Sequence, residues 1–68
     1  MNISNTLLEN RKKNNLTQMD IAKELDFKST DRISRWEQGL TYPHVKNLFK
    51  LAKLFGVKAE ELYPDDAL

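Results

Sequence analysis

The stretch LTQMDIAKELDFKSTDRISRWEQG, residues 16–39, decides the fold that this sequence predicts. It begins with a capping-box pattern, because Thr17 can accept a hydrogen bond from a free backbone N–H and Asp20 follows three residues later. Apolar residues then recur at helical spacing, namely Ile21, Ala22 and Leu25. The pattern predicts a short helix that ends near Leu25.

The second half of this stretch predicts another short helix with a polar surface. After a turn at residues 26–29, Ser29 or Thr30 caps a helix that runs to about residue 38 and stops at a glycine. Only Ile33 and Trp36 are strongly apolar, and we interpret both as core anchors. Two anchors bury only one edge of a helix, so core packing alone explains this helix poorly. We therefore expect its exposed polar side chains to have a function. Two such helices joined by a turn are suited to reading DNA.

The rest of the chain predicts three further helices and no strand. One spans about Ile3 to Lys13, with inward-facing Ile3, Leu7 and Leu8 and a left-handed exit at Asn14-Asn15. Another spans about Val45 to Phe55, with a stripe of Val45, Leu48, Ala52 and Phe55 that stops at Gly56. A short helix covers about Ala59 to Tyr63, before Pro64. The expected fold class is all-α, a compact five-helix bundle that forms one domain over residues 1–68.

Composition limits the possible functions. The chain has 68 residues and no cysteine, so disulfides and cysteine-based metal sites are excluded and stability must come from packed helices. No apolar run approaches the roughly 20 residues that cross a bilayer, and the amino terminus lacks the pattern of a secretion signal. We therefore expect a cytoplasmic protein. The chain offers no Gly-rich phosphate loop and only one histidine, which argues against an enzyme and against any cofactor or metal.

The net charge of +1 conceals an asymmetry along the chain. Residues 1–58 hold all eleven Lys and Arg against six Asp and Glu, which leaves +5. The last ten residues hold four acidic side chains and no basic one, which gives −4. A basic body with an acidic end can orient one face toward phosphates. The alternative is that the acidic end only keeps the domain soluble.

The sequence resembles the helix-turn-helix regulators of the phage repressor and Cro type, also called the xenobiotic-response-element (XRE) type. The resemblance covers about residues 3–63 and rests on Arg11, Leu16-Thr17-Gln18, Ile21-Ala22, Leu25, Ile33-Ser34-Arg35-Trp36-Glu37, Gly39, Pro43, Leu51-Ala52 and Gly56-Val57. It implies the lambda-repressor-like fold, with the helix-turn-helix at the second and third helices. It also implies binding to double-stranded operator DNA, usually an inverted repeat, by a homodimer. Such a protein is expected to be encoded by a bacterium or phage and to associate with the nucleoid.

Two features depart from the family pattern. Asp26 stands where the family usually has a glycine in a left-handed conformation, which Asp tolerates better than most residues. The turn is also one residue longer than the commonest family spacing, counted from Gln18 to Ile33. The longer turn shifts the expected register of base contacts at the start of the third helix.

Groove chemistry suggests which side chains read bases. Arg offers a bidentate fork to guanine, Thr a hydroxyl and a methyl group, and Asp an acceptor for the cytosine amino group. The expected base contacts are Thr30, Asp31, Ser34 and Arg35. Thr30 is equally well explained as a helix cap, and Asp31 as a complement to the helix dipole.

Phosphate contacts are expected from side chains that flank the third helix. The resemblance places Gln18 where the family commonly grips the DNA backbone. The other expected contacts are Lys28, Arg32, Tyr42, His44 and Lys46, with Arg32 shared between base and phosphate. A solvated role for His44 is the alternative, and a lone histidine is no metal site.

The resemblance also implies a structural clamp and a dimer. In the family an Arg on the first helix meets the Glu that closes the recognition helix, which here pairs Arg11 with Glu37. Apolar side chains at the carboxyl-terminal end offer a dimer contact or complete the core, namely Leu51, Leu54, Tyr63, Ala67 and Leu68.

The sequence thus predicts a sequence-specific transcriptional regulator that represses by occluding a promoter. One alternative is an antitoxin-like protein-interaction module that regulates its own operon, although only five residues follow Tyr63. The other alternative is a controller of a restriction-modification operon.

Overall fold

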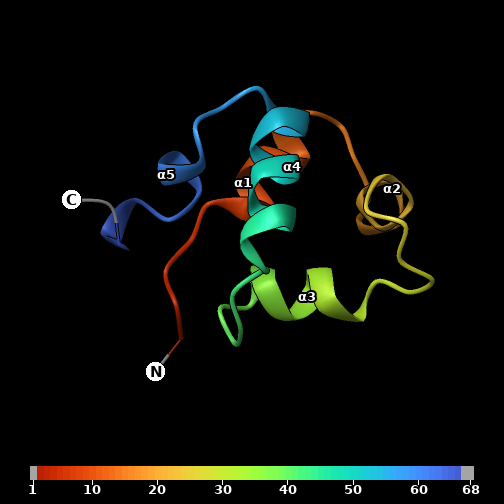
Figure 1. Ribbon diagram of the computed structural model, residues 1–68, viewed down its shortest axis with the longest axis horizontal. Helices are drawn as coiled ribbons and strands as arrows, with labels where there is room; N and C mark the ends of the chain where they lie inside the picture. Colours follow the sequence, from red (N-terminus) through yellow and green to blue (C-terminus); the bar gives the residue numbers. More distant parts are fainter. Residues whose placement is uncertain (1, 67–68) are drawn as a thin grey trace.

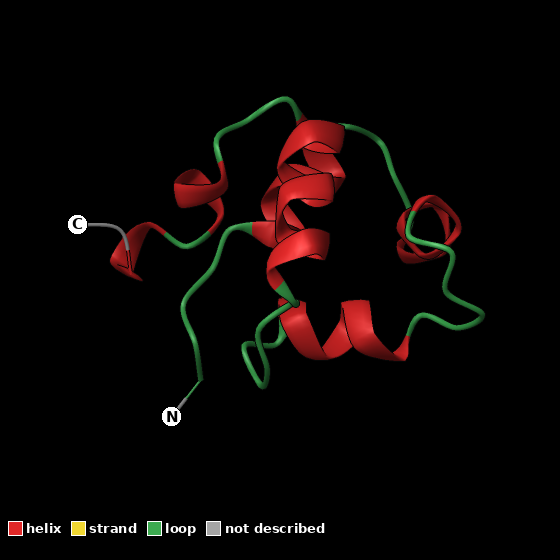
Figure 2. Ribbon diagram, viewed as in Figure 1, coloured by secondary structure: helices red, strands yellow, loops and turns green. Residues whose placement is uncertain are grey.

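Five α-helices follow one another along the computed structural model, which describes residues 2–66 (Figure 1). They are α1 (Leu7–Lys13), α2 (Gln18–Glu24), α3 (Asp31–Glu37), α4 (Val45–Phe55) and α5 (Ala59–Leu62), and a 3-10 turn, η1 (Pro64–Asp66), follows. The described part of the chain contains no strand (Figure 2). The prediction of an all-α, five-helix fold is confirmed.

The helices pack around α4, the longest of them. In Figure 1, α1 lies behind α4, α2 and α5 flank this pair on opposite sides, and α3 crosses below it. The buried core draws on every helix and consists of Leu7, Ile21, Ala22, Leu25, Ile33, Trp36, Leu51, Ala52, Phe55, Leu62 and Tyr63. The helix-turn-helix unit therefore rests on a support made by the other three helices.

Each of the first four helices is followed, one or two positions after its last residue, by a residue with left-handed backbone. These residues are Asn15 (φ 57°), Asp26 (φ 63°), Gly39 (φ 76°) and Gly56 (φ 71°). In each case the next backbone N–H donates to the carbonyl five residues earlier, at 2.8–3.1 Å, as in a Schellman motif. The left-handed conformations expected at Asp26 and after α1 are confirmed.

The first helix is shorter than predicted. It begins at Leu7 rather than Ile3, with Thr6 at the N-cap, because the Thr6 N–H donates to the distant Leu62 carbonyl (3.0 Å). The side chain of Asn5 accepts a hydrogen bond from the Leu7 N–H (3.0 Å) in the first turn. The preceding segment is extended instead, and the Ile3 N–H donates to the Gly39 carbonyl (2.7 Å). The expected inward position of Leu8 is wrong, since this side chain is 40% exposed. With the helix shortened, Leu7 alone of the two leucines is buried.

The fourth helix has the predicted bounds but a different buried face. Val45, expected on the buried stripe, is 56% exposed in the first turn of α4, and Leu51 is only 2% exposed. Leu51 and Tyr63 belong to the core, so neither supplies the free dimer contact considered above, whereas Leu54 is partly buried. Ala67 and Leu68 lie outside the described residues. No helix in the described range is long and apolar enough to span a membrane.

Candidate nucleic-acid interface

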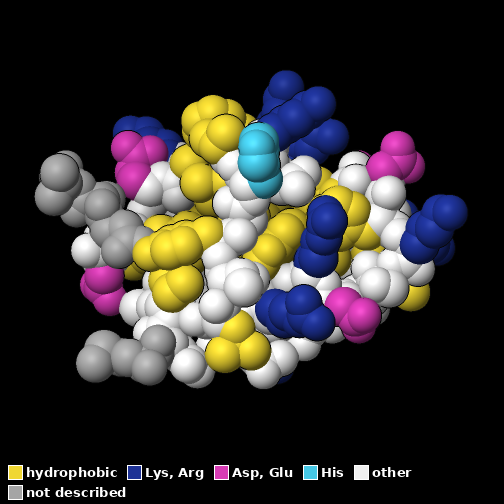
Figure 3. All heavy atoms as spheres, turned by 60° about the horizontal axis from the view of Figure 1, so that its bottom comes forward, with side chains coloured by type: hydrophobic (Ala, Val, Ile, Leu, Met, Phe, Trp, Pro, Cys, Tyr) yellow, Lys and Arg dark blue, Asp and Glu magenta, His cyan; other side chains and the backbone are white. Residues whose placement is uncertain are grey.

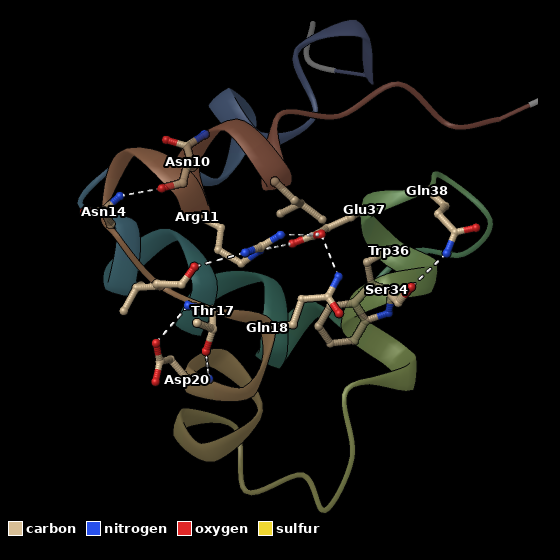
Figure 4. Close-up of polar contacts among 12 residues, drawn as sticks. Asn10, Arg11, Asn14, Thr17, Gln18, Asp20, Ser34, Trp36, Glu37 and Gln38 are labelled. Carbon is tan, nitrogen blue, oxygen red and sulfur yellow. Dashed lines mark hydrogen bonds and ion pairs between the residues drawn. The ribbon is translucent and has the colours of Figure 1, made fainter.

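The start of α2 is fixed by the capping box that its sequence predicts. The Thr17 hydroxyl accepts from the Asp20 N–H (3.0 Å), and the Thr17 N–H donates to the Asp20 carboxylate (2.8 Å; Figure 4). The backbone hydrogen bond from Thr17, and then its side-chain bond, lower the pKa of Asp20. The carboxylate stays ionised at neutral pH and holds the first turn of α2 in place.

The turn between α2 and α3 takes its direction from Asp26 and Phe27. Asp26 reverses the chain in the left-handed conformation, and the Phe27 N–H donates to the Ala22 carbonyl (2.8 Å). The Phe27 ring packs edge-on against Trp36, with 5.8 Å between ring centroids. An aromatic contact thus ties the turn to the last turn of α3.

Helix α3 is anchored on one edge and polar on the other. Ile33 and Trp36 are buried in the core, as predicted for both. Asp31, Arg32 and Arg35 are exposed, whereas Thr30 and Ser34 are partly buried. Thr30 occupies the cap position but makes no side-chain capping bond, and the Ser34 hydroxyl accepts from the Gln38 amide (2.8 Å). The structure therefore places three charged side chains side by side on the outer surface of α3.

The carboxyl end of α3 is held by a buried carboxylate (Figure 4). Glu37 accepts from the Arg11 Nε (2.6 Å) and Nη2 (3.2 Å), and from the Gln18 Nε2 (2.9 Å). The third Arg11 bond goes from Nη1 to the Leu16 carbonyl (3.0 Å). One side chain thus connects the end of α3 to α1 and α2, and the structure brings the expected pair Arg11 and Glu37 into contact.

A hollow of about 480 Å³ lies between α3 and the start of α4. Its lining consists of Arg32, Arg35, Trp36, Thr41, Tyr42, His44 and Asn47. Figure 3 shows the face that carries α3, on which several Lys and Arg side chains stand around the hydrophobic ones. Cations at the edge of a hollow attract anions, and phosphate oxygens match the guanidinium donors.

The residues expected to contact phosphates lie on α3 or beside it, and four of them have partners within the fold, namely Gln18, Arg32, Tyr42 and His44. Gln18 donates to Glu37, and the His44 Nδ1 accepts from the Lys46 N–H (3.3 Å), which caps α4. The Tyr42 ring packs against Tyr63, with 5.2 Å between centroids, although Tyr42 is exposed. Lys28, in the turn, and the Lys46 side chain are exposed.

Three residues at this surface, Phe27, Thr41 and Asn47, are not predicted from the sequence. Thr41 and Asn47 line the hollow, and Phe27 lies under the Arg32 guanidinium, with Cζ 4.8 Å from the ring centroid. The signal for Phe27 was an aromatic residue inside an otherwise polar turn. Thr41 and Asn47 carry no such signal, because their positions depend on how α4 packs beside α3.

Within the described part of the chain, no group of three or more His, Asp or Glu side chains could hold a metal ion. The features that remain are a short helix fixed by its neighbours, the outward charges on that helix and a cation-lined hollow beside it. This arrangement can contact the edges of base pairs with one helix and phosphates with the surrounding loops.

Comparisons with known proteins agree with this geometry. The helix-turn-helix family matches residues 7–62. An uncharacterised HTH-type transcriptional regulator of Methanocaldococcus jannaschii is 44% identical over 66 residues, which cover 94% of this chain and 98% of the relative. The HTH-type transcriptional activator BcrR of Enterococcus faecalis is 35% identical over the whole chain, which spans only 33% of that activator. The chain therefore belongs to the XRE-type helix-turn-helix family and is a DNA-binding transcriptional regulator rather than an enzyme.

Proposed function

We propose that this regulator binds an inverted-repeat operator in double-stranded DNA as a homodimer and represses transcription by occluding the promoter. The observation that carries the proposal is the way in which α3 is fixed to the other helices. Its carboxyl end is fixed by Glu37, its inner edge by Ile33 and Trp36, and its charged residues point outward. A helix held in this way can enter the major groove without reordering the fold.

Base readout falls to the outer surface of α3. Arg35 is exposed, and its fork of donors matches the two acceptors of guanine. Asp31 is exposed one turn earlier and can accept from a cytosine amino group. The proposed base contacts are Thr30, Asp31, Ser34 and Arg35.

Phosphate contacts fall to the residues around α3, which are Gln18, Lys28, Arg32, Tyr42, His44 and Lys46. Gln18 uses one amide N–H on Glu37 and keeps its carbonyl and its second N–H. His44 uses Nδ1 as an acceptor, so in the neutral ring the proton is on Nε2, where it can be donated to a phosphate oxygen. Both side chains therefore arrive at DNA already oriented by the fold.

Dimer formation on DNA follows from the small size of the reading surface. Helix α3 has only seven residues, so one copy can read only a few base pairs. Two copies related by two-fold symmetry would place their reading helices about 34–36 Å apart, one turn of the double helix. An inverted repeat with that spacing is the operator that such a dimer would prefer.

Activation of transcription is the second candidate, because the relative from Enterococcus faecalis is named an activator. Repression and activation can be distinguished by the position of the operator relative to the promoter. A reporter whose operator overlaps the promoter should lose expression under repression, whereas an operator upstream of the promoter should raise expression under activation.

The proposed function is tested by selecting bound duplexes from a random DNA pool at about 0.15 M salt, since affinity depends strongly on salt. Enrichment of an inverted repeat would support a dimeric, operator-reading regulator. Enrichment of a single half-site would favour binding by one copy. A folded protein that enriches no sequence would contradict the proposal and favour an antitoxin-like role in which another protein is the main partner.

A further inference from the structure

Phe27 occupies a fixed position in the turn between α2 and α3. Its backbone N–H is bonded to the Ala22 carbonyl (2.8 Å), and its ring packs against Trp36 and is partly buried. The other side chains of this turn, Asp26, Lys28 and Ser29, are exposed. The ring is thus a rigid aromatic surface within a polar and exposed segment.

Arg32 is exposed on α3, and its guanidinium lies over this ring, with Cζ 4.8 Å from the centroid. Residues 2–65 provide no hydrogen bond or ion pair to this guanidinium. The cation therefore owes its position to the ring, and all five of its N–H donors stay available to a ligand. Arg35, one turn later, has no such aromatic contact among the described residues.

A flexible arginine loses side-chain freedom when it binds, and this loss lowers affinity. A guanidinium already held over an aromatic ring has lost part of that freedom in the free protein. The ring also directs Arg32 toward the turn, where a second hollow of about 420 Å³ is lined in part by Asp26, Lys28 and Ser29. The two cations and the hydroxyl suit a phosphate group, and the two cations outnumber the one carboxylate on the same hollow.

We propose that Phe27 is a positioning residue that holds the Arg32 guanidinium over the turn so that its donors meet a DNA phosphate. This inference rests on the proposed function, in which Arg32 contacts the DNA backbone. Phe27 acts through Arg32 and itself touches no DNA.

A double-mutant cycle tests the coupling between the two residues. Binding to the selected duplex and to a scrambled duplex is measured by fluorescence anisotropy at about 0.15 M salt. Phe27→Leu keeps an apolar side chain and should weaken binding by roughly two- to fivefold, the factor expected for an exposed cation–π contact. The same substitution in an Arg32→Ala background should have no effect, because the cation is already absent. Phe27→Tyr keeps the ring and should bind as the parent protein does.

Arg35→Ala provides the matched control, since it also removes an exposed arginine of α3. In that background Phe27→Leu should keep its full effect. If Phe27→Leu weakens binding equally with and without Arg32, the ring acts through the fold or touches DNA itself, and the inference is overturned. If Arg32→Ala binds as the parent does while Arg35→Ala is weakened, DNA reading stands and only this inference fails.

A measurement on the free protein covers the case in which Phe27→Leu does not fold. Protons that lie over an aromatic ring resonate upfield of their usual positions. The Arg32 Nε–H and Nη–H protons, which are carried by the nitrogens bonded to Cζ, should show this shift in the parent and in Phe27→Tyr. Ordinary shifts for these protons in the folded parent would overturn the inference regardless of the binding data.

Discussion

Replacement of Arg11 by methionine should lower the free energy of unfolding by about 3–5 kcal/mol. The side chains of the pair are 14% exposed for Arg11 and 7% exposed for Glu37. Without Arg11, the Glu37 carboxylate keeps only the Gln18 amide as a donor, and the Leu16 carbonyl loses a bond. The cost is that of leaving a charge buried with one donor, which is larger than the roughly 0–1 kcal/mol of an exposed ion pair.

This loss is large for a domain of 68 residues, whose total stability is on the order of 3–10 kcal/mol. The variant is therefore expected to be mostly unfolded on warming. Replacing both partners, Arg11→Met with Glu37→Leu, removes the buried charge along with its cation. The double variant should recover most of the loss, because apolar replacements of a buried pair are often close to neutral.

Urea unfolding, followed by the fluorescence of Trp36 and by circular dichroism, measures each free energy. Lys12→Met is the matched control, because it removes a positive charge from an exposed position of the same helix and should change stability by less than about 0.5 kcal/mol. The reasoning is refuted if Arg11→Met costs less than about 1 kcal/mol. It is also refuted if the double variant loses the sum of the two single losses.

Three further changes have defined outcomes. Arg35→Ala should weaken binding to the selected operator by about 1–3 kcal/mol and relax the preference at one base pair. Competition between operator variants measures both effects. An equal loss of affinity for scrambled DNA would contradict the assignment of Arg35 as a base contact. Gly39→Ala should lower the melting temperature more than Gly56→Ala, because an added Cβ would lie 2.3 Å from a backbone oxygen at Gly39 and meets nothing within 4 Å at Gly56. Equal losses would show that strain from the positive φ, which the two glycines share, dominates over the clash. Hydrogen bonds in the capping box lower the pKa of Asp20, so its contribution to stability is present above the ordinary value of 3.8 and declines as the pH falls below it. In Asp20→Asn the unfolding free energy should lose the pH dependence that the Asp20 carboxylate contributes. An unchanged pH dependence in this variant would contradict the role given to Asp20.

Features set by near neighbours in the sequence were predictable. Thr17 and Asp20 are three residues apart and form the expected capping box, and Asp26 adopts the expected left-handed conformation. The bounds of α4, Val45–Phe55, follow from helical periodicity and a terminal glycine. In these cases the physical cause lies within one turn of the residue that it affects.

Features set by distant contacts were not predictable from the residues alone. The first helix is shortened because residues 2–6 bond to other parts of the chain, including the Gly39 carbonyl, and periodicity gives no sign of such bonds. Val45 is exposed and Leu51 belongs to the common core, and the periodicity of α4 alone does not specify which face the other helices cover. The contact between Phe27 and Arg32 joins a turn to a helix, and sequence spacing does not specify that geometry.

The backbone bond between Ile3 and Gly39 has a practical consequence for labelling. It fixes the amino-terminal segment beside the loop that follows α3, as Figure 1 also shows. A purification tag or dye fused before this segment would emerge next to the surface proposed to meet DNA, and would compete with the operator for space. The chain reaches η1 on the α5 side of the molecule, away from α2 (Figure 1). A label attached beyond η1 starts on the side away from α2 and, although Tyr42 packs against Tyr63 near this end, is the better choice for affinity measurements.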